Sequence, residues 1–233
     1  MRNFSKTLLL IFFISSCSTP LKIIKFPRTN DEVYSNSNLK EFFKANPKPN
    51  IVLRVPNNND QVTSKNLSSK DNKLLFDNNF LYNSIEKELV IQNFSVRDRA
   101  LFNELLSKSK STNYSNIKEL TNTDLILEVL SIDRNVVYTT NKFIVKDKKG
   151  DYEKLSLTSF KQNGASVEFR IILVKNNEIA GSYKYKYPPC PNGCSINFFK
   201  SSGKLVLKED IFENNELEPL IKLSIQDLVN SIK

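Results

Sequence analysis

The stretch DLILEVLSI, residues 124–132, decides how this chain folds. Its residues are almost all apolar, and a run of this kind is typical of a strand that is buried on both faces of a sheet. Strands with one face in water alternate between apolar and polar residues instead. We therefore expect a central strand at this position, with the neighbouring elements arranged around it.

Further strands are predicted after the central one. The segment VVYTTNKFIVKDKKGDYEKLSLTSF, residues 136–160, indicates a hairpin whose turn is KDKKGD. Ala165–Val174 alternates between apolar and polar residues, and Ile179–Tyr187 returns after an Asn-Asn turn. Short strands are also predicted at Ile51–Val55 and Phe94–Arg97. The chain thus contains enough strands for a sheet.

Helices are predicted where apolar residues recur three and four positions apart. The predicted helices are residues 78–92, a segment that begins after Asp98, a short segment near Ser115, and Leu217–Ile232, which is the clearest of them. Together with the strands, this order predicts an α/β (α+β) fold, in which helices pack on a mixed β-sheet and a helix closes the chain. We expect residues 50–233 to form this single domain.

The N-terminus shows, in order, the features of a bacterial lipoprotein signal. Arg2 and Lys6 precede an apolar run that is too short to cross a bilayer but suits a signal peptide. Ile14-Ser15-Ser16-Cys17 resembles the lipobox, after which the cysteine becomes the acylated N-terminus. We predict that residues 1–16 are removed and that Cys17 carries the lipid. The alternative is an ordinary signal peptide with a chance cysteine.

The residues after Cys17 bear on location. Ser18, and not an aspartate, follows Cys17. By resemblance to enterobacterial sorting, this residue implies that the protein lies in the outer membrane, with its body on the periplasmic side. The polar stretch KFPRTNDEVYSNSN and the prolines beyond it favour a flexible tether over residues 17–49. The lipid anchor would thus be the membrane contact.

Composition excludes several functions. The chain has no histidine, which excludes Ser-His-Asp and Cys-His catalysis and removes the commonest metal ligand. With Cys17 given to lipid, two cysteines remain, too few for a closed zinc site. We therefore expect no enzyme activity, no metal and no cofactor. A pair of carboxylates of the glycosidase kind stays open, although their spacing singles out no pair.

The net charge of +9 is best explained by a lysine-rich, solvated surface. Attraction to anionic lipid headgroups, to an acidic glycan or to an acidic partner is the alternative. We expect no nucleic acid, because no basic block with interleaved aromatic residues is present.

The segment PPCPNGCSINFF, residues 188–199, contains the other two cysteines. Their spacing, with a Pro-Asn-Gly turn between them, predicts a small disulfide between Cys190 and Cys194 in an oxidising periplasm. A thiol redox site is the alternative, but C-x-x-x-C is not the C-x-x-C of that chemistry. The loop could also present itself to a partner.

Two segments resemble a known family. LYNSIEKELVIQNFSVRDRALFNELLSKSK, residues 81–110, and NIKELTNTDLILEVLSI, residues 116–132, resemble the CsgG-type lipoproteins of the curli secretion family, whose core is shared by the TolB N-terminal domain and by lipoprotein activators of penicillin-binding proteins. The resemblance covers roughly residues 50–187 and the last helix. Asp98, which stands between Arg97 and Arg99 in the VRDR corner, is expected to cap the helix that follows. The alternative is a ligand role for these three residues.

The resemblance implies a non-enzymatic, periplasm-facing lipoprotein that is a structural or accessory subunit of a cell-envelope or secretion assembly. A protein partner in the envelope is expected, and formation of a homo-oligomer is open. One alternative is an adaptor that reaches across the periplasm to activate a cell-wall synthesis enzyme.

The other alternative is a ring-forming secretion channel, which requires that residues 133–166 form long hairpins facing lipid. Val136–Val145 has the length, but Asn141 and Lys142 interrupt its apolar alternation, and the loop at residues 56–73 is too polar for a second hairpin. The family fold without a pore therefore fits the sequence better.

Overall fold

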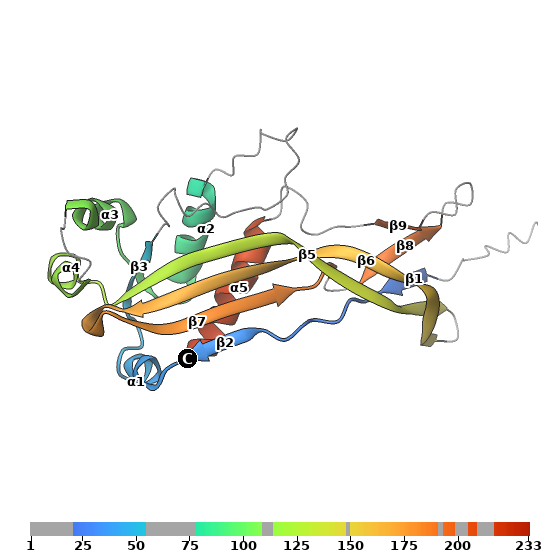
Figure 1. Cartoon of the computed structure of the whole chain (residues 1–233), viewed down its shortest axis with the longest axis horizontal. Coiled ribbons are helices and arrows are strands. Elements are labelled where there is room, and N and C mark those ends of the chain that lie inside the picture. Colours follow the sequence, from blue (N-terminus) through green and yellow to red (C-terminus); the bar gives the residue numbers. More distant parts are fainter. Residues whose placement is uncertain are drawn as a thin grey trace, which may run out of the picture.

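The computed structural model describes residues 21–54, 78–108, 114–147, 150–190, 193–198, 205–208 and 217–233. Within these ranges the chain has an α+β fold, in which helices pack on one mixed sheet and a helix lies at the C-terminus (Figure 1). The fold class predicted from the sequence is therefore confirmed. Cys17 and the loop at residues 56–73 lie outside the described residues.

The elements follow one another in mixed order. The strands are β1 (Leu21–Ile24), β2 (Glu32–Ser35), β3 (Asn50–Arg54), β4 (Ser95–Val96), β5 (Leu125–Asp147), β6 (Gly150–Leu173), β7 (Glu178–Tyr187), β8 (Cys194–Phe198) and β9 (Leu205–Lys208). The helices are α1 (Ser37–Ala45), α2 (Asn78–Ile91), α3 (Arg99–Lys108), α4 (Tyr114–Thr121) and α5 (Leu217–Ile232), with a short 3₁₀ turn, η1 (Val174–Asn176).

The described strands form one nine-stranded sheet, in which β5 has the central place. Seven strands follow the order β2-β7-β6-β5-β1-β8-β9, while β3 pairs with both β4 and β5. β3 runs parallel to the start of β5, whereas β1 runs antiparallel to its end. The prediction that residues 124–132 belong to a central strand is thus confirmed.

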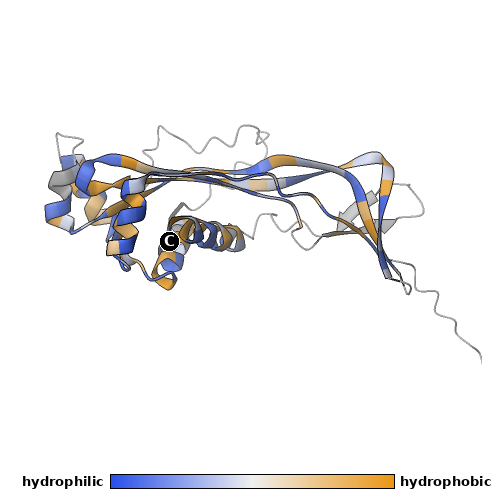
Figure 2. Ribbon diagram, turned by 90° about the horizontal axis from the view of Figure 1, so that it is seen from below, coloured by the Kyte–Doolittle hydropathy of each residue, from blue (hydrophilic) through white to orange (hydrophobic). Residues whose placement is uncertain are grey.

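The main core lies on one face of the sheet. Apolar side chains of α1, α2 and α5 pack there against the inward residues of β3, β5, β6 and β7. Among the largest buried side chains are Phe169, Tyr183 and Tyr185. A smaller cluster on the opposite face joins Phe102 of α3 to Val52 and Ile126. Figure 2 shows the sheet edge-on, with the C-terminal helix against one face.

β5 and β6 are much longer than expected. The sequence predicts separate strands on either side of Asp133–Asn135, but the structure has one 23-residue strand and one 24-residue strand that pair from end to end. Register shifts between Val129 and Ser131 and between Asp133 and Val136 absorb the irregular residues. Bulges of this kind bend a strand without ending its pairing.

The predicted flexible tether is wrong for residues 21–49. β1 pairs with β5, β2 pairs with β7, and α1 buries Leu39 completely in the main core. Asn36 caps α1, because its side-chain oxygen accepts a hydrogen bond from the Leu39 N–H at 2.9 Å. Residues 21–49 therefore belong to the folded body, which the sequence predicts at residues 50–233.

Candidate interaction surface

The end of the β5–β6 hairpin projects beyond the helices. We call residues 136–147 and 150–164 the arm. These residues pair with one another from Val136 opposite Gly164 to Asp147 opposite Gly150. In Figure 1 the arm extends to the right, and the short strands β1, β8 and β9 lie beside it. The arm is therefore part of the sheet that no described helix covers.

One edge of the arm has no strand partner among the described residues. β6 pairs with β5 on one side along its length, but it pairs with β7 on the other side only from Ala165 to Leu173. The backbone of Gly150–Gly164 therefore presents a row of N–H and C=O groups to its surroundings. Such an edge can pair with a strand of another chain.

Exposed leucines accompany this open edge. Leu155 is 68% exposed and Leu157 is fully exposed. The pairing of Thr140 with Phe160 is followed by that of Lys142 with Leu155, so residues 156–159 bulge out opposite a single residue of β5. A bulge and nearby lysines hinder the pairing of arbitrary strands with this edge. The exposed leucines at the bulge favour a partner that has a matching apolar surface.

The root of the arm has a small core of its own. Ile24, Phe26, Tyr138 and Phe160 pack there with the two cysteines. Gly164 is needed at this point, because a Cβ atom would lie 2.3 Å from the Tyr187 carbonyl oxygen and 2.6 Å from the Tyr138 ring. The arm is thus held firmly where it leaves the body.

The structure joins Cys190 and Cys194 by a disulfide, with their Cα atoms 5.2 Å apart. Both cysteines are buried against the root of the arm. Gly193 has a φ of +94° within this turn, and a Cβ atom there would lie 2.2 Å from the Ile23 side chain. The pairing predicted from the sequence is therefore present, and its burial indicates a structural bond.

Replacing both Cys190 and Cys194 by serine is expected to lower the free energy of unfolding by about 2 kcal/mol, because the closed loop is short. Urea unfolding of the variant and the wild type measures the difference. A reductant should lower the stability of the wild type to the same extent and leave the variant unchanged. Equal stability of the two proteins without reductant would contradict a structural role.

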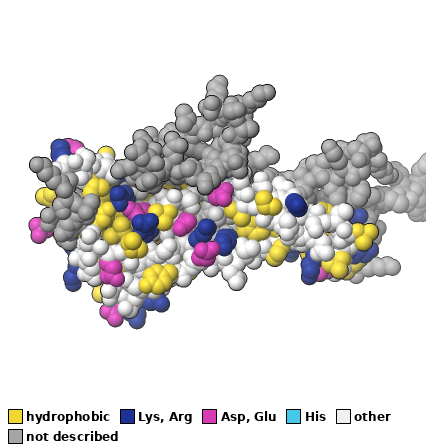
Figure 3. Space-filling model, in the orientation of Figure 1, with side chains coloured by type: hydrophobic (Ala, Val, Ile, Leu, Met, Phe, Trp, Pro, Cys, Tyr) yellow, Lys and Arg dark blue, Asp and Glu magenta, His cyan; other side chains and the backbone are white. Residues whose placement is uncertain are grey.

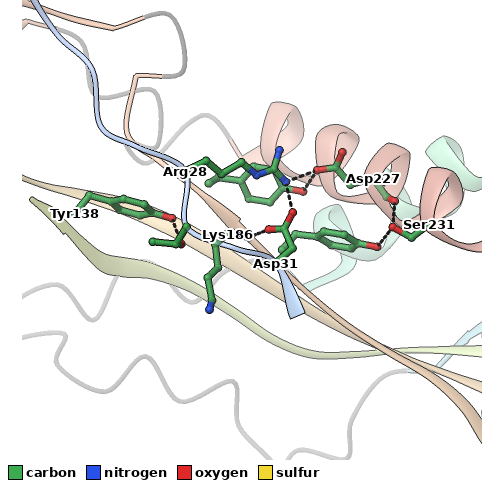
Figure 4. A network of polar contacts seen from close by, with 9 residues as sticks. Arg28, Asp31, Tyr138, Lys186, Asp227 and Ser231 are labelled. Carbon is green, nitrogen blue, oxygen red and sulfur yellow. Dashed lines mark hydrogen bonds and ion pairs between the residues drawn. The ribbon is translucent and has the colours of Figure 1, made fainter. Parts of the chain in front are cut away.

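A set of polar contacts fastens the segment between β1 and β2 to the body (Figure 4). We call Arg28, Asp31, Tyr187 and Asp227 the clasp. Arg28 donates hydrogen bonds to Asp31 at 2.8 Å and to Asp227 of α5 at 3.0 Å. The Tyr187 hydroxyl donates to Asp227 at 2.9 Å, and the Arg28 guanidinium lies over the Tyr187 ring.

The clasp ties three distant parts of the chain together. Asp31 also accepts a hydrogen bond from the Lys186 backbone N–H at 2.8 Å, which places it beside β7. Nearby, the Tyr185 hydroxyl donates to Ser231 of α5 at 3.0 Å. Burial, together with the negative charge of Asp227, raises the pKa of Tyr187 above its ordinary value. The clasp thus keeps the N-terminal segment on the same body as α5.

Stability is expected to fall as the pH rises above about 10, the ordinary pKa of tyrosine. Burial raises the pKa values of Tyr183, Tyr185 and Tyr187, so the folded chain keeps these protons where the unfolded chain loses them. Tyr187→Phe should reduce the steepness of this fall. Urea unfolding at neutral and alkaline pH measures it, and an unchanged slope would contradict the role of Tyr187.

The VRDR corner has structural partners. The Leu101 N–H donates to the Asp98 carboxylate at 2.9 Å, so the predicted helix cap is confirmed. Arg97 donates to the Asn50 side chain at 2.8 Å. Arg99 lies 3.3 Å from Glu86 and stacks over the Tyr82 ring. These contacts support the capping interpretation of the corner over a ligand role.

A charged group on the opposite sheet face is also paired. Glu128 is buried on β5, where Arg54 donates to it and Arg170 lies 3.4 Å from it.

Among the described residues, no group of three or more His, Cys, Asp or Glu side chains could hold a metal ion. In the same ranges, no helix has both the length and the apolar character needed to cross a membrane.

Comparison with known proteins gives no relative, since no protein-family model, no curated protein and no solved structure matches the chain.

The candidate surface combines residues that the sequence predicted and residues that it did not. The hairpin and the disulfide follow from local patterns. The open edge of β6 does not, because only the pairing of all the strands shows which edges lack partners. The clasp cannot be predicted from local sequence patterns either, because Arg28 and Asp227 are 199 positions apart in the sequence.

Proposed function

We propose that this protein is a non-enzymatic, periplasm-facing outer-membrane lipoprotein that acts as a structural subunit of a cell-envelope assembly. The observation that carries the proposal is the arm, whose outer edge over Gly150–Gly164 lacks a strand partner in the described part of the chain. Lipidation at Cys17, the outer-membrane location and the resemblance to CsgG-type lipoproteins remain predictions from the sequence.

A second copy of this chain presents the same open edge and the same exposed leucines, Leu155 and Leu157. Two such edges that pair antiparallel would bring the apolar bulges of both copies together. This arrangement favours a homo-oligomer.

The alternatives have less support. The adaptor needs reach, but residues 21–49 are folded onto the body and supply no long tether. The arm is long enough for a channel hairpin, for which about 9–11 residues per strand suffice. However, both faces of the arm carry lysines, with Lys142 and Lys146 on one face and Lys154 on the other, so either face would bring charge to the lipid. Charged side chains facing lipid are costly.

The proposal is tested by a photo-reactive amino acid at position 157 of the intact lipoprotein in its own membrane. Illumination should give a covalent product of twice the subunit mass, and mass spectrometry should find this chain in both halves. The same amino acid at position 120, where an exposed leucine lies on α4, is the matched control and should give none. A cross-link to a different protein only, or none at all, would contradict the homo-oligomer.

A further inference from the structure

A short segment of the chain crosses the arm where the arm leaves the body. We call residues 25–31, which connect β1 to β2, the strap. β1 lies beyond β5 in the order of the sheet and β2 lies beyond β7, so the strap has to pass from one side of the β5–β6 hairpin to the other. The strap is thus a connection between arm and body that is separate from the hairpin.

The sheet narrows at the joint between arm and body, which we place at residues 133–136 and 164–166. The pairing of β7 with β6 ends at Ala165, so from Gly164 onward β6 pairs only with β5 among the described residues. At the same level β5 has a register shift between Asp133 and Val136. Such a bulge interrupts the hydrogen-bond ladder and bends the strand. Figure 3 shows the described part of the molecule narrowing from the body on the left to the arm on the right. The joint is therefore the place where the hairpin bends most easily.

The beginning of the strap is fastened to the arm. β1, directly before the strap, pairs with residues 143–146 of the arm. Phe26 is buried in the small core at the arm root, together with Tyr138 and Phe160. The Thr29 hydroxyl lies 3.5 Å from the Tyr138 hydroxyl. A movement of the arm would therefore carry the beginning of the strap with it.

The clasp fastens the same strap to the body. Arg28 reaches Asp227 of α5, and its guanidinium lies 5.2 Å from the centre of the Tyr187 ring at the end of β7. Figure 4 shows Tyr138 of the arm on one side of the strap, and Asp227 and Ser231 of α5 on the other. Only two positions separate Phe26, which is held by the arm, from Arg28, which is held by the body. The strap has no slack between these two attachments.

We propose that the strap is a brace that fixes the angle between the arm and the body, and that opening of the clasp lets the arm swing about the joint. The Arg28 side chain is 44% exposed, so water competes with its ion pairs. The clasp is therefore the attachment of the strap that opens most readily, whereas Phe26 stays in the root core. This inference concerns a single copy of the chain and needs neither the lipid anchor nor the homo-oligomer.

The angle of the arm matters for the open edge. Phe160 packs with the strap residue Phe26 and belongs to that edge, directly after the bulge at residues 156–159. A swing of the arm would change the direction of the open edge relative to the body, and with it the strands that the edge can meet.

The test measures the distance between the arm and the body in the purified full chain. Spin labels are attached to ketone-bearing amino acids at position 152 in the arm and at position 175 in η1, at the far end of β6. Labelled protein is mixed with an excess of unlabelled protein, so that only distances within one copy contribute. The wild type should give one narrow distance distribution. Arg28→Ala should broaden it at least about 1.5-fold, because the arm then samples several angles.

Arg99→Ala is the matched control. Arg99 also has a carboxylate partner, Glu86, and also lies over a tyrosine ring, that of Tyr82, but these contacts join α3 to α2 and do not cross the joint. Its replacement should leave the distance distribution as narrow as in the wild type. A second variant, Asp227→Asn, removes the charge that Arg28 meets on α5 but keeps the shape of the side chain, and it should broaden the distribution as Arg28→Ala does.

The outcomes decide the inference in either direction. Broadening in Arg28→Ala and Asp227→Asn, with a narrow distribution in Arg99→Ala, supports the brace. If either clasp variant is folded and keeps the narrow distribution of the wild type, the inference is overturned. Equal broadening in Arg99→Ala would contradict it as well, because the loosening would then not be specific to the strap.

Discussion

Replacing Cys17 by serine is expected to move this protein from the membrane pellet to the supernatant when a cell lysate is centrifuged. Each buried methylene of an acyl chain contributes about 0.8 kcal/mol to anchoring, and several chains on one cysteine hold a protein stably. Immunoblots of the two fractions and incorporation of labelled palmitate measure the effect.

The matched control removes the other cysteines. A variant with Cys190→Ser and Cys194→Ser should stay in the pellet and incorporate palmitate as the wild type does, because these residues form the disulfide at the arm root. A Cys17→Ser protein that remains in the pellet after high salt and still incorporates palmitate would show that Cys17 is not the acylated residue.

Replacing Leu39 by alanine is expected to lower the free energy of unfolding by about 2–5 kcal/mol. Leu39 has no exposed surface and packs in the main core. The N-terminal end of its helix, α1, is fixed to β7, because the Asn36 backbone N–H donates to the Ala180 carbonyl at 3.0 Å and the Asn36 side chain donates to Glu178 at 2.6 Å. The lost contacts leave a cavity that this anchored helix cannot close.

The measurement is urea unfolding, with Lys40→Ala as the control. Lys40 is the next residue along α1 and is exposed, so its replacement should change the stability by no more than about 0.5 kcal/mol. A flexible tether would predict no effect at either position. A Leu39→Ala protein as stable as the wild type would therefore contradict the inclusion of residues 21–49 in the fold.

The main body of the fold was predictable because its signals are local. The apolar run at residues 124–132 marked the centre of the sheet, and the regular spacing from Leu220 to Ile232 marked α5. Asp98 stands directly before an apolar helix, where a cap is expected. Each of these features needs no more than its neighbours in the chain to be recognised.

The elements of residues 21–49 are hard to predict from the sequence because they are short and polar on average. β1 and β2 each have four residues, and α1 has nine. Strands this short show too little alternation to be recognised, and their stability comes from distant partners such as β5 and β7. The clasp is of the same kind, since Arg28 finds Asp227 only in the folded chain.

The length of β5 and β6 was underestimated for a related reason. Asp133 and Asn135 suggest a turn, because both residue types are frequent there. In the structure the Asn135 N–H donates to the Asp133 side chain at 2.8 Å, and the strand continues beyond the bulge. Pairing with β6 outweighs the local preference, and the arm is the result.

The most direct test of the assembly role is the mass of the detergent-extracted, lipidated protein, measured by light scattering and supported by particle imaging. We expect a dimer that has twice the mass of one subunit. Leu157→Lys, at the open edge, should reduce it to a single subunit, whereas Leu120→Lys on α4 should not. A wild-type protein that has the mass of one subunit would contradict the account.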